Sequence, residues 1–559
     1  MKVASTTSTN NTIIEYLNRW VHESSDEIWL RDRQGDRFTQ WSWKEAYAEM
    51  QSVAAWLESE YGNDGSRFAI LSRNCAHWML ADTAITASGN VSVPIFTTQS
   101  VDSAKYILDF SEVRIIFVGE SENWSQVSDI VSDHVQLIAL PGTGISRPHV
   151  KWTDIVNANT GKRATHVCRH DELMSLVFTS GTTGVPKGVM QTHDSMLIPM
   201  ERAAQAFNMR HNPRFLSYLP LAHVAERQLV WIQSLIHCGT VTFNESFPSL
   251  VRDMGEAIPT YFFGAPRVWE QIQQGILAQF GSQSALDAAL AANEVGVGLK
   301  IRTLLGLTDT DCLLTASAPT PAALIRWYEK LGIVLMEGYG QTEAMGLICN
   351  LEGHRKIGSI GKPIEGTDVK IAGSGELLCK AAGLSPGYYK MPEKTAETFV
   401  DGWVHTGDKA RVDEDGYYYI TGRVKDYFKT IHGKYVAPSP IENAFARNPW
   451  VEQLCLLGRG YSKTVIICVL SEIAQQEDRD VIEASLMSQV KELNRTTEKH
   501  ARVGAVVVTG QPWTIENGLL TPTLKIKRDE VEEHFGKQAE GLAHESAVSG
   551  EILVRYISE

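Results

Sequence analysis

The sequence predicts an α/β fold with a large, multi-lobed N-terminal domain of layered sheets and helices and a smaller α+β C-terminal domain. The chain has 559 residues, a length that predicts more than one hydrophobic core. Short apolar runs at 68–71 and 113–118 resemble buried strands, and they alternate with helical segments. The composition changes near residue 420, and the remainder of about 130 residues is long enough to fold separately. We therefore expect domains at 1–424 and 425–559.

One helix is predicted in detail, between Ser42 and Gly62. Ser42 and Glu45 have the spacing of a capping box, and Gly62 is suited to end the helix. Apolar residues then recur at helical spacing: Ala46, Met50, Val53 and Leu57. Further on, 416–420 resembles a strand and 421–426 a polar connector at the domain boundary.

Composition and charge restrict the class of protein. Hydrophobic residues make up 43% and charged residues 21%, which is typical of a soluble globular chain. The net charge of -14 disfavours nucleic acid and anionic membranes as partners, so an anionic substrate needs a locally basic pocket. The polar N-terminus and the lack of a long apolar run predict no signal peptide and no transmembrane segment. We expect a cytoplasmic protein, with peripheral membrane contact left open.

The cysteines and histidines give little support for a metal cluster. The eight cysteines form no CxxC pair, and scattered cysteines are typical of a reducing compartment. His166, Cys168 and His170 would share one face of a strand, but no fourth ligand is evident. A surface segment is the expected interpretation, with a metal site as the alternative.

A glycine-rich loop lies between two predicted strands, 173–178 and 189–192. Glycines allow backbone N–H groups to approach phosphate oxygens, hydroxyls add donors and a lysine adds charge. The candidate phosphate-binding residues are Thr179, Ser180, Gly181, Thr182, Thr183, Gly184 and Lys187. The spacing does not fit the P-loop of kinases and GTPases, and no GxGxxG follows a strand, which disfavours a dinucleotide oxidoreductase.

This loop resembles the phosphate-binding motif of the adenylate-forming (AMP-binding) superfamily. Further segments occur in the order typical of that family: 219–227, 337–343, 402–408, 422–426 and 520–528. The segments 264–270 and 428–438 are similar to those of long-chain fatty acyl-CoA synthetases. The resemblance implies an acid–thiol ligase. It would convert a fatty acid and ATP to acyl-AMP and diphosphate, and then transfer the acyl group to CoA.

The implied first step joins two anions, a carboxylate and the α-phosphate of ATP. At about 4 Å, two unit charges interact by roughly 4 kcal/mol at an effective dielectric constant of 20. A metal and a lysine cancel that repulsion better than an acid–base pair, since a carboxylate needs no deprotonation at neutral pH.

The resemblance also implies a role for each matching residue. Residues 179–187 would hold the β- and γ-phosphates, Thr342 would contact the α-phosphate and Glu343 would bind Mg²⁺. Tyr339 would lie against adenine. Asp408 would bind the ribose hydroxyls with help from Arg423. The implied catalytic residues are Lys525, which bridges carboxylate and α-phosphate, together with Thr342, Glu343 and His223.

For the second step, the resemblance implies that the C-terminal domain is mobile and rotates. Lys425 would be the hinge, and Lys429 and Gly433 would lie on the face used in thioester formation. His223 would lie on the acyl-substrate side. Trp269 and the pair 262–263 either line an acyl tunnel or pack in the core. The segment 315–319 is less glycine-rich than is usual in the family, which would narrow the nucleotide pocket.

Other functions remain open at this stage. An acyl-AMP ligase would share the nucleotide residues and deliver the acyl group to a carrier protein. A luciferase-like oxidase and a non-catalytic scaffold that kept the fold are two further readings. A homodimer is also left open, because relatives include dimers.

Overall fold

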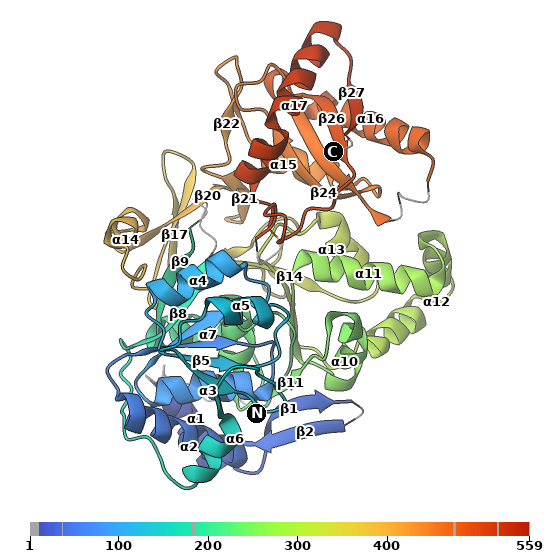
Figure 1. The fold of residues 1–559 in the computed structure, drawn as a ribbon. Helices are drawn as coiled ribbons and strands as arrows, with labels where there is room; N and C mark the ends of the chain where they lie inside the picture. Colours follow the sequence, from blue (N-terminus) through green and yellow to red (C-terminus); the bar gives the residue numbers. More distant parts are fainter. Residues whose placement is uncertain are drawn as a thin grey trace. The chain divides into compact units, whose positions relative to one another are not determined.

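The computed structural model describes residues 11–35, 37–179, 185–472, 474, 477–521 and 525–557 (Figure 1). The chain divides into two compact units. The large unit comprises Met1–Lys370, Leu378–His405 and Asp413–Tyr418, and the small unit comprises Ile371–Leu377, Thr406–Val412 and Tyr419–Glu559. The predicted fold class, a large α/β N-terminal part and a smaller C-terminal part, is confirmed.

The large unit contains a seven-stranded sheet with the order β7-β6-β5-β3-β4-β8-β9. Its central strands are buried on both faces, which explains their continuous apolar sequences. All neighbours are parallel except β8 and β9, which are antiparallel. The strands are β3 (Arg67–Leu71), β4 (Val91–Ile95), β5 (Ile115–Val118), β6 (Gln136–Ala139), β7 (Val150–Lys151), β8 (Leu173–Thr179) and β9 (Lys187–Thr192). The strands predicted at 68–71, 113–118, 173–178 and 189–192 are confirmed, with small changes at their ends.

A five-stranded sheet of the large unit has the order β12-β13-β14-β15-β16. Its first three strands are parallel, and β14 turns back into β15 as an antiparallel hairpin. The strands are β12 (Tyr261–Gly264), β13 (Cys312–Thr315), β14 (Leu335–Gln341), β15 (Ala344–Cys349) and β16 (Lys362–Pro363). The helices of this region are α10 (Leu250–Ala257), α11 (Pro266–Phe280), α12 (Gln283–Leu304) and α13 (Ala322–Glu329).

A third sheet of the large unit is four-stranded, with the order β10-β11-β1-β2. Its strands are β1 (Ile28–Gln34), β2 (Arg37–Ser42), β10 (Arg214–Ser217) and β11 (Thr240–Phe243). The helices that precede residue 240 in the chain are α1 (Ile13–Glu23), α2 (Trp43–Tyr61), α3 (Ala76–Ala87), α4 (Val101–Phe110), α5 (Trp124–Ile130), α6 (Trp152–Ala158), α7 (His193–Ala206), α8 (Val224–Glu226), the π-helix η1 (Arg227–Ile232) and α9 (Gln233–His237). The helix α2 confirms the prediction, because Ser42 and Glu45 form both bonds of the capping box and Gly62 is the C-cap.

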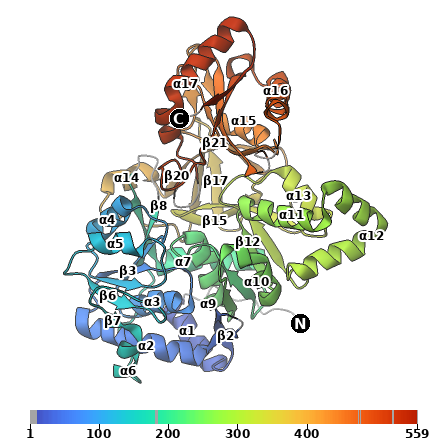
Figure 2. The ribbon, with the colours of Figure 1, turned by 45° about the vertical axis from the view of Figure 1, so that its right-hand side comes forward.

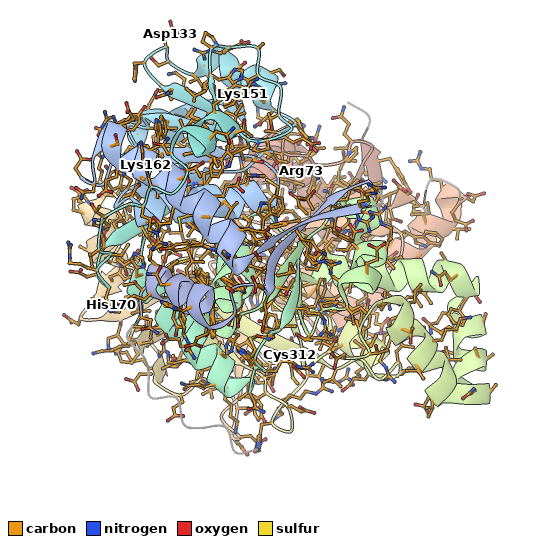
Figure 3. All side chains as sticks on the ribbon, turned by 90° about the horizontal axis from the view of Figure 1, so that it is seen from below. Arg73, Asp133, Lys151, Lys162, His170 and Cys312 are labelled. Carbon is orange, nitrogen blue, oxygen red and sulfur yellow. The ribbon has the colours of Figure 1, made fainter. Side chains whose placement is uncertain are left out.

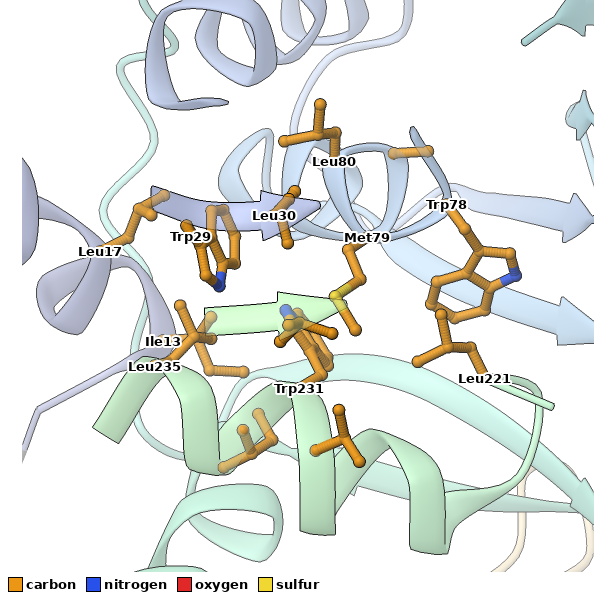
Figure 4. Close-up of a cluster of buried hydrophobic side chains, with 14 of the residues drawn as sticks. Ile13, Leu17, Trp29, Leu30, Trp78, Met79, Leu80, Leu221, Trp231 and Leu235 are labelled. Atoms are coloured by element: carbon orange, nitrogen blue, oxygen red, sulfur yellow. The ribbon is translucent and has the colours of Figure 1, made fainter. Parts of the chain in front are cut away.

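Tryptophans dominate the main core of the large unit. Trp29 stacks on Trp43 with ring centroids 4.6 Å apart, and both are fully buried. Figure 4 shows Trp29, Trp78 and Trp231 among the aliphatic side chains of this core. The core therefore joins α1, α2, α3 and the π-helix.

Several strands contribute residues to both units. These strands are β17 (Thr367–Ile371), β18 (Glu376–Ala381), β20 (Trp403–Val412) and β21 (Tyr418–Arg423), whereas α14 (Pro392–Thr398) and β19 (Phe399–Val400) lie wholly in the large unit. The prediction of a strand at 416–420 followed by a connector at 421–426 was wrong in its limits. The strand begins at Tyr418 and continues to Arg423, because its pairing with β20 extends the strand into the polar residues that follow Ile420.

The small unit is built on a four-stranded sheet with the order β24-β25-β26-β27. Figure 2 labels the helices of this unit, α15, α16 and α17. Alternate residues of each strand face opposite sides, so Leu454 and Leu456 join one core while Cys455 and Leu457 join another. The elements are β22 (Phe428–Lys429), β23 (Tyr435–Val436), α15 (Pro438–Phe445), β24 (Val451–Leu457), β25 (Thr464–Leu470), α16 (Arg479–Thr496), β26 (Val503–Thr509), α17 (Arg528–Ser549) and β27 (Leu553–Ile557). Among the described residues of the whole chain, no helix combines the length and apolarity needed to cross a membrane.

Candidate active site

Thr342 and Glu343 form the turn of the β14–β15 hairpin. Gln341 pairs with Ala344 across the hairpin, which leaves these two residues at its tip. The Gln191 side chain donates to the Thr342 carbonyl at 2.7 Å, and the Ser385 backbone N–H donates to the Glu343 carbonyl at 3.0 Å. The turn is therefore held from two directions, and the predicted α-phosphate and metal residues lie next to each other.

Lys187 lies at the base of the glycine-rich loop. It pairs with Thr179 across β8 and β9, so these two residues are the ends from which the loop emerges. The loop positions predicted to bind phosphate between them, Ser180, Gly181, Thr182, Thr183 and Gly184, lie outside the described residues. The predicted arrangement of strand, loop and strand is confirmed for its two strands.

Tyr388 lies between Lys187 and the Glu343 carboxylate and contacts both. Its hydroxyl donates to Glu343 Oε1 at 2.6 Å, and Lys187 Nζ lies 5.1 Å from the centre of its ring. Burial, followed by the nearby Glu343 charge, raises the pKa of Tyr388, so the hydroxyl keeps its proton at neutral pH. Sequence reasoning missed this residue. The available signal was a pair of tyrosines directly after Pro386 and Gly387.

Tyr339 lies on β14, close to the hairpin turn. Its hydroxyl accepts a hydrogen bond from the Gln341 side chain at 3.0 Å, and both side chains are partly buried. Residues two apart on a strand share a face, which explains this contact. Tyr339, Thr342 and Glu343 are thus brought together by one hairpin.

His223 caps the short helix α8. Its Nδ1 accepts from the Ala225 backbone N–H at 3.1 Å, so the ring is a half-buried cap rather than a core residue. The loop before it is held by Asn74, whose amide donates to Leu219 O at 2.6 Å and whose carbonyl oxygen accepts from Leu221 N at 2.9 Å. Sequence reasoning missed Asn74, because the contacts join residues far apart in the chain.

The aromatic candidates for an acyl tunnel are core residues. Trp269 is fully buried and donates its indole N–H to Leu314 O at 3.3 Å. The Phe262 ring lies 5.4 Å from it in an edge-on arrangement, and Phe263 is also buried. These contacts support the core interpretation of the two that the sequence left open.

Asp408 and Arg423 form an ion pair within the small unit. Arg423 Nε lies 2.8 Å from Asp408 Oδ1; the Asp408 side chain is buried, whereas that of Arg423 is 47% exposed. The Asp408 backbone N–H donates to Thr406 Oγ1 at 3.1 Å, which fixes the strand at this point. The two residues predicted to bind ribose are therefore in contact.

The other predicted residues of the small unit lie in turns. Lys425 is exposed in the turn after β21. Lys429 Nζ lies 4.9 Å from the centre of the Tyr435 ring, across the β22–β23 hairpin. Gly433 has a φ of +69° in the turn of that hairpin, and its N–H donates to Thr430 O at 2.9 Å.

Lys525 is exposed and closes a loop of the small unit. Its backbone N–H donates to Thr521 Oγ1 at 3.0 Å, and its carbonyl accepts from Thr521 N at 2.8 Å. Leu520 pairs with Ile526, which brings the ends of the loop together. The loop residues Pro522, Thr523 and Leu524 lie outside the described residues.

The small unit also has a concentration of positive charge that sequence reasoning missed. The β22–β23 hairpin is bonded to two other segments: Gly460 N donates to Lys429 O at 2.7 Å, and His500 Nε2 lies 3.0 Å from Tyr435 O. We call the cations of these three segments the basic face: Lys429, Lys434, Arg459, Lys463, Lys499 and Arg502. The acidic residues beside these cations are Glu498, within the same segments, and Glu532 of α17, whose carboxylate lies 3.5 Å from Arg459 Nε.

The triplet His166, Cys168 and His170 does not converge on a common point. His166 pairs with Glu172 at 2.8 Å, Cys168 contacts Thr86 O at 3.6 Å, and His170 pairs with Asp194 at 3.1 Å. His170 lies at the edge of the view in Figure 3. Across the described residues, no group of three His, Cys, Asp or Glu side chains could hold a metal. Thr165, Val167 and Arg169, which alternate with the triplet, are exposed, so the segment lies at the surface.

The fold and the site define a two-unit α/β protein whose large unit gathers a lysine and a hairpin carboxylate at the base of a glycine-rich loop. The sequence profile of the AMP-binding enzyme family matches residues 17–389, and that of the AMP-binding enzyme C-terminal domain matches residues 425–546. The chain belongs to the AMP-binding enzyme family.

Relatives and solved structures agree with this membership. The chain is 29% identical to a long-chain-fatty-acid–CoA ligase of Mycobacterium bovis, over 89% of this chain and 91% of the relative. It is 25% identical to a chloroplastic long-chain-fatty-acid–[acyl-carrier-protein] ligase of Arabidopsis thaliana, over 92% and 84%. It shares its fold with the adenylation domain of a carboxylate reductase from Mycobacterium chelonae, with a TM-score of 0.80, 22% identity and coverage of 96% and 92%. The predicted resemblance to the adenylate-forming superfamily is confirmed.

Proposed function

We propose that this enzyme activates a fatty acid with ATP to acyl-AMP and diphosphate, and then transfers the acyl group to CoA. The observation that carries the proposal is the placement of Lys187 and Glu343 on either side of Tyr388, at the base of the glycine-rich loop. A cation and a hard carboxylate ligand beside a phosphate-binding loop are what adenylation requires. The long-chain relatives support a fatty acid as the substrate.

In the large unit, residues 179–187 would hold the β- and γ-phosphates, and Thr342 would contact the α-phosphate. Tyr339 would lie against adenine. Glu343 is suited to Mg²⁺, because its carboxylate lies at an accessible hairpin tip and is already oriented by a hydrogen bond. One carboxylate completed by substrate phosphates is a usual Mg²⁺ arrangement, and it agrees with the lack of a three-residue cluster among the described residues. The ion would neutralise phosphate charge.

In the small unit, the Asp408 carboxylate would accept hydrogen bonds from the ribose hydroxyls, with Arg423 fixing its orientation. The exposed Lys525 would bridge the carboxylate and the α-phosphate during adenylation. For thioester formation, we propose that residues 425–559 move about Lys425 and present Lys429 and Gly433. The division of the catalytic work between 1–424 and 425–559 is part of this proposal.

The proposed reaction has two steps, adenylation of the fatty acid and thioester formation. A carboxylate oxygen attacks the α-phosphorus, the bond to the bridging oxygen breaks, and diphosphate leaves. The CoA sulfur then attacks the carbonyl carbon of acyl-AMP, loses its proton and displaces AMP. Lys187 and Lys525 would offset the repulsion between the anionic reactants of the first step, and His223 would lie beside the acyl substrate.

The basic face supports a polyanionic acceptor, and CoA carries several phosphate charges. A second candidate function is delivery of the acyl group to a carrier protein, favoured by the relative of that activity in Arabidopsis thaliana.

All eight cysteines are free thiols, which supports our proposal of a cytoplasmic location.

The test separates the two steps. Purified protein is given Mg²⁺, ATP and a panel of fatty acids, with CoA, with a phosphopantetheinylated carrier protein, or with neither. Diphosphate release without an acceptor measures adenylation, and thioester formation identifies the acceptor. Lys525→Ala should abolish adenylation but retain thioester formation from supplied acyl-AMP, whereas the neighbouring Lys527→Ala should retain both. Failure of the unmodified protein to form AMP and diphosphate with any carboxylic acid would refute the proposal.

A further inference from the structure

We infer that Tyr388 is a positioning residue that orients the Glu343 carboxylate for Mg²⁺ and keeps Lys187 at a fixed separation from it. This inference rests on the proposed function, which assigns Glu343 to the metal and Lys187 to the phosphates. Three features of Tyr388 carry it: the hydroxyl, the ring and the backbone.

The hydroxyl acts on the metal ligand. The hydrogen bond to Glu343 Oε1 is 2.6 Å long, in the short range expected when a hydroxyl donates to a carboxylate. Carboxylates that bind metals are usually held in this way by a neighbouring donor, and loss of that donor typically lowers metal affinity by 10- to 100-fold. Tyr388 therefore fixes the rotation of the Glu343 carboxylate at the hairpin tip.

The ring acts on the lysine. Lys187 Nζ lies 5.1 Å from the ring centre, within the distance of a cation–π interaction. A lysine paired directly with Glu343 would neutralise the negative charge of the carboxylate that binds the metal. The same lysine would then no longer be available to bind phosphate. With the ring and the hydroxyl holding different partners, one side chain keeps the cation and the carboxylate close but separate.

The backbone of Tyr388 is fixed to the strand that leaves the loop. Tyr388 pairs with Val189 of β9, and the next residue, Tyr389, donates its N–H to Gly188 O at 2.8 Å. The Tyr388 N–H donates to Thr395 Oγ1 at 2.9 Å. The backbone of Tyr388 is therefore bonded to β9, the strand that also carries Lys187. Its side chain spans the gap from that strand to the β14–β15 turn and so fixes the distance between them.

Gly387 makes this approach feasible. Its φ is +133°, and a Cβ at this position would lie 2.3 Å from Thr395 Cγ2. A side chain there would displace the segment that presents Tyr388.

The test is Tyr388→Phe, which keeps the ring and removes the hydroxyl. Manganese binding in the presence of a non-hydrolysable ATP analogue, followed by electron paramagnetic resonance, should weaken 10- to 100-fold. The Mg²⁺ concentration needed for half-maximal diphosphate release should rise by a similar factor, while the analogue binds as tightly as before without metal. Tyr389→Phe is the matched control and should behave as the unmodified enzyme, because its ring contacts Phe110 and Lys390 instead.

A double-mutant cycle assigns the effect to the carboxylate. Tyr388→Phe should have no further effect on manganese binding in a Glu343→Gln background. Unchanged manganese affinity in Tyr388→Phe, or an equal loss in both backgrounds, would overturn the inference, as would unfolding of Tyr388→Phe while Tyr389→Phe stays folded. These outcomes leave the proposed function intact if the unmodified enzyme still adenylates fatty acids, so the two failures are distinguishable.

Discussion

Replacing Arg227 with methionine should remove roughly 3–5 kcal/mol from the free energy of unfolding of the large unit. Arg227 and Asp82 form an ion pair with Nη2–Oδ2 at 2.7 Å, and both side chains are 0% exposed. Arg227 Nη1 also donates to Ser175 Oγ at 2.7 Å, and Ser175 in turn contacts Ser92 on the neighbouring strand. The ion pair thus joins the π-helix to α3, and the serine contacts extend this connection to β4 and to β8, the strand that enters the glycine-rich loop.

The magnitude follows from the charge that the substitution leaves behind. Burial raises the pKa of Asp82, and the Arg227 guanidinium opposes that shift. Without Arg227, the carboxyl must either take up a proton or remain charged in an apolar core. Replacing both partners avoids this cost. The double variant Asp82→Leu with Arg227→Met should therefore have a free energy of unfolding equal to that of the unmodified chain or higher by about 1–4 kcal/mol. A methionine at 227 would also pack between Trp78 and Trp231, which flank the guanidinium.

The assay is urea unfolding of the full chain, followed by tryptophan fluorescence and by amide exchange of β8, because a chain of several cores need not unfold in one step. The matched control is Arg19→Met, which breaks an exposed ion pair with Glu23 and should cost less than about 1 kcal/mol. A loss below about 1 kcal/mol for Arg227→Met, or a double variant as unstable as the single one, would refute the reasoning.

The remaining predictions concern pH and backbone strain. Burial lowers the pKa of His193 to about 4, so the free energy of unfolding should fall as the pH drops from about 6.5 to about 4. The difference in that free energy between pH 7 and pH 4.5 should be smaller in His193→Asn than in the unmodified chain. Burial raises the pKa of Glu226 to about 8; stability should therefore fall as the pH rises from about 4.5 to about 8, and Glu226→Gln should flatten that slope in the same assay. Gly361→Ala should lower the thermal midpoint by several degrees, because its φ is +96° and a Cβ would lie 2.0 Å from the Cys349 carbonyl carbon, whereas Gly373→Ala in open space should not.

The sequence predicts those features whose signals are local. The helix α2 is an example, because its capping box and its apolar spacing lie within one segment. The strand β8 is recognised from its apolar run at 173–178, and β9 from the strand-like stretch at 189–192 that follows the glycine-rich loop. In the same way, Asp408 and Arg423 were predicted as site residues from the segments 402–408 and 422–426, without knowledge of the ion pair between them.

The features that could not be predicted depend on contacts between distant segments. Tyr388 meets Glu343 and Lys187 only because β9 pairs with the chain at Tyr388 and the β14–β15 turn comes close to it. The basic face has the same origin, since its three segments are separated in sequence and meet through backbone bonds. Neither pattern has a local periodicity that a reader of the sequence could use.

The difference between a property of the whole chain and a local arrangement also limits what can be inferred about substrates from the net charge. A charge of -14 argues against anionic partners only if it acts at long range, yet at physiological ionic strength charges are screened beyond about 8 Å. Within that distance, an anion at the basic face meets mostly cations, and an anion at Lys187 meets that cation together with the nearby Glu343 carboxylate. The binding of ATP and of a phosphorylated acceptor is therefore compatible with an acidic chain, because local placement decides the sign of the field that a substrate meets.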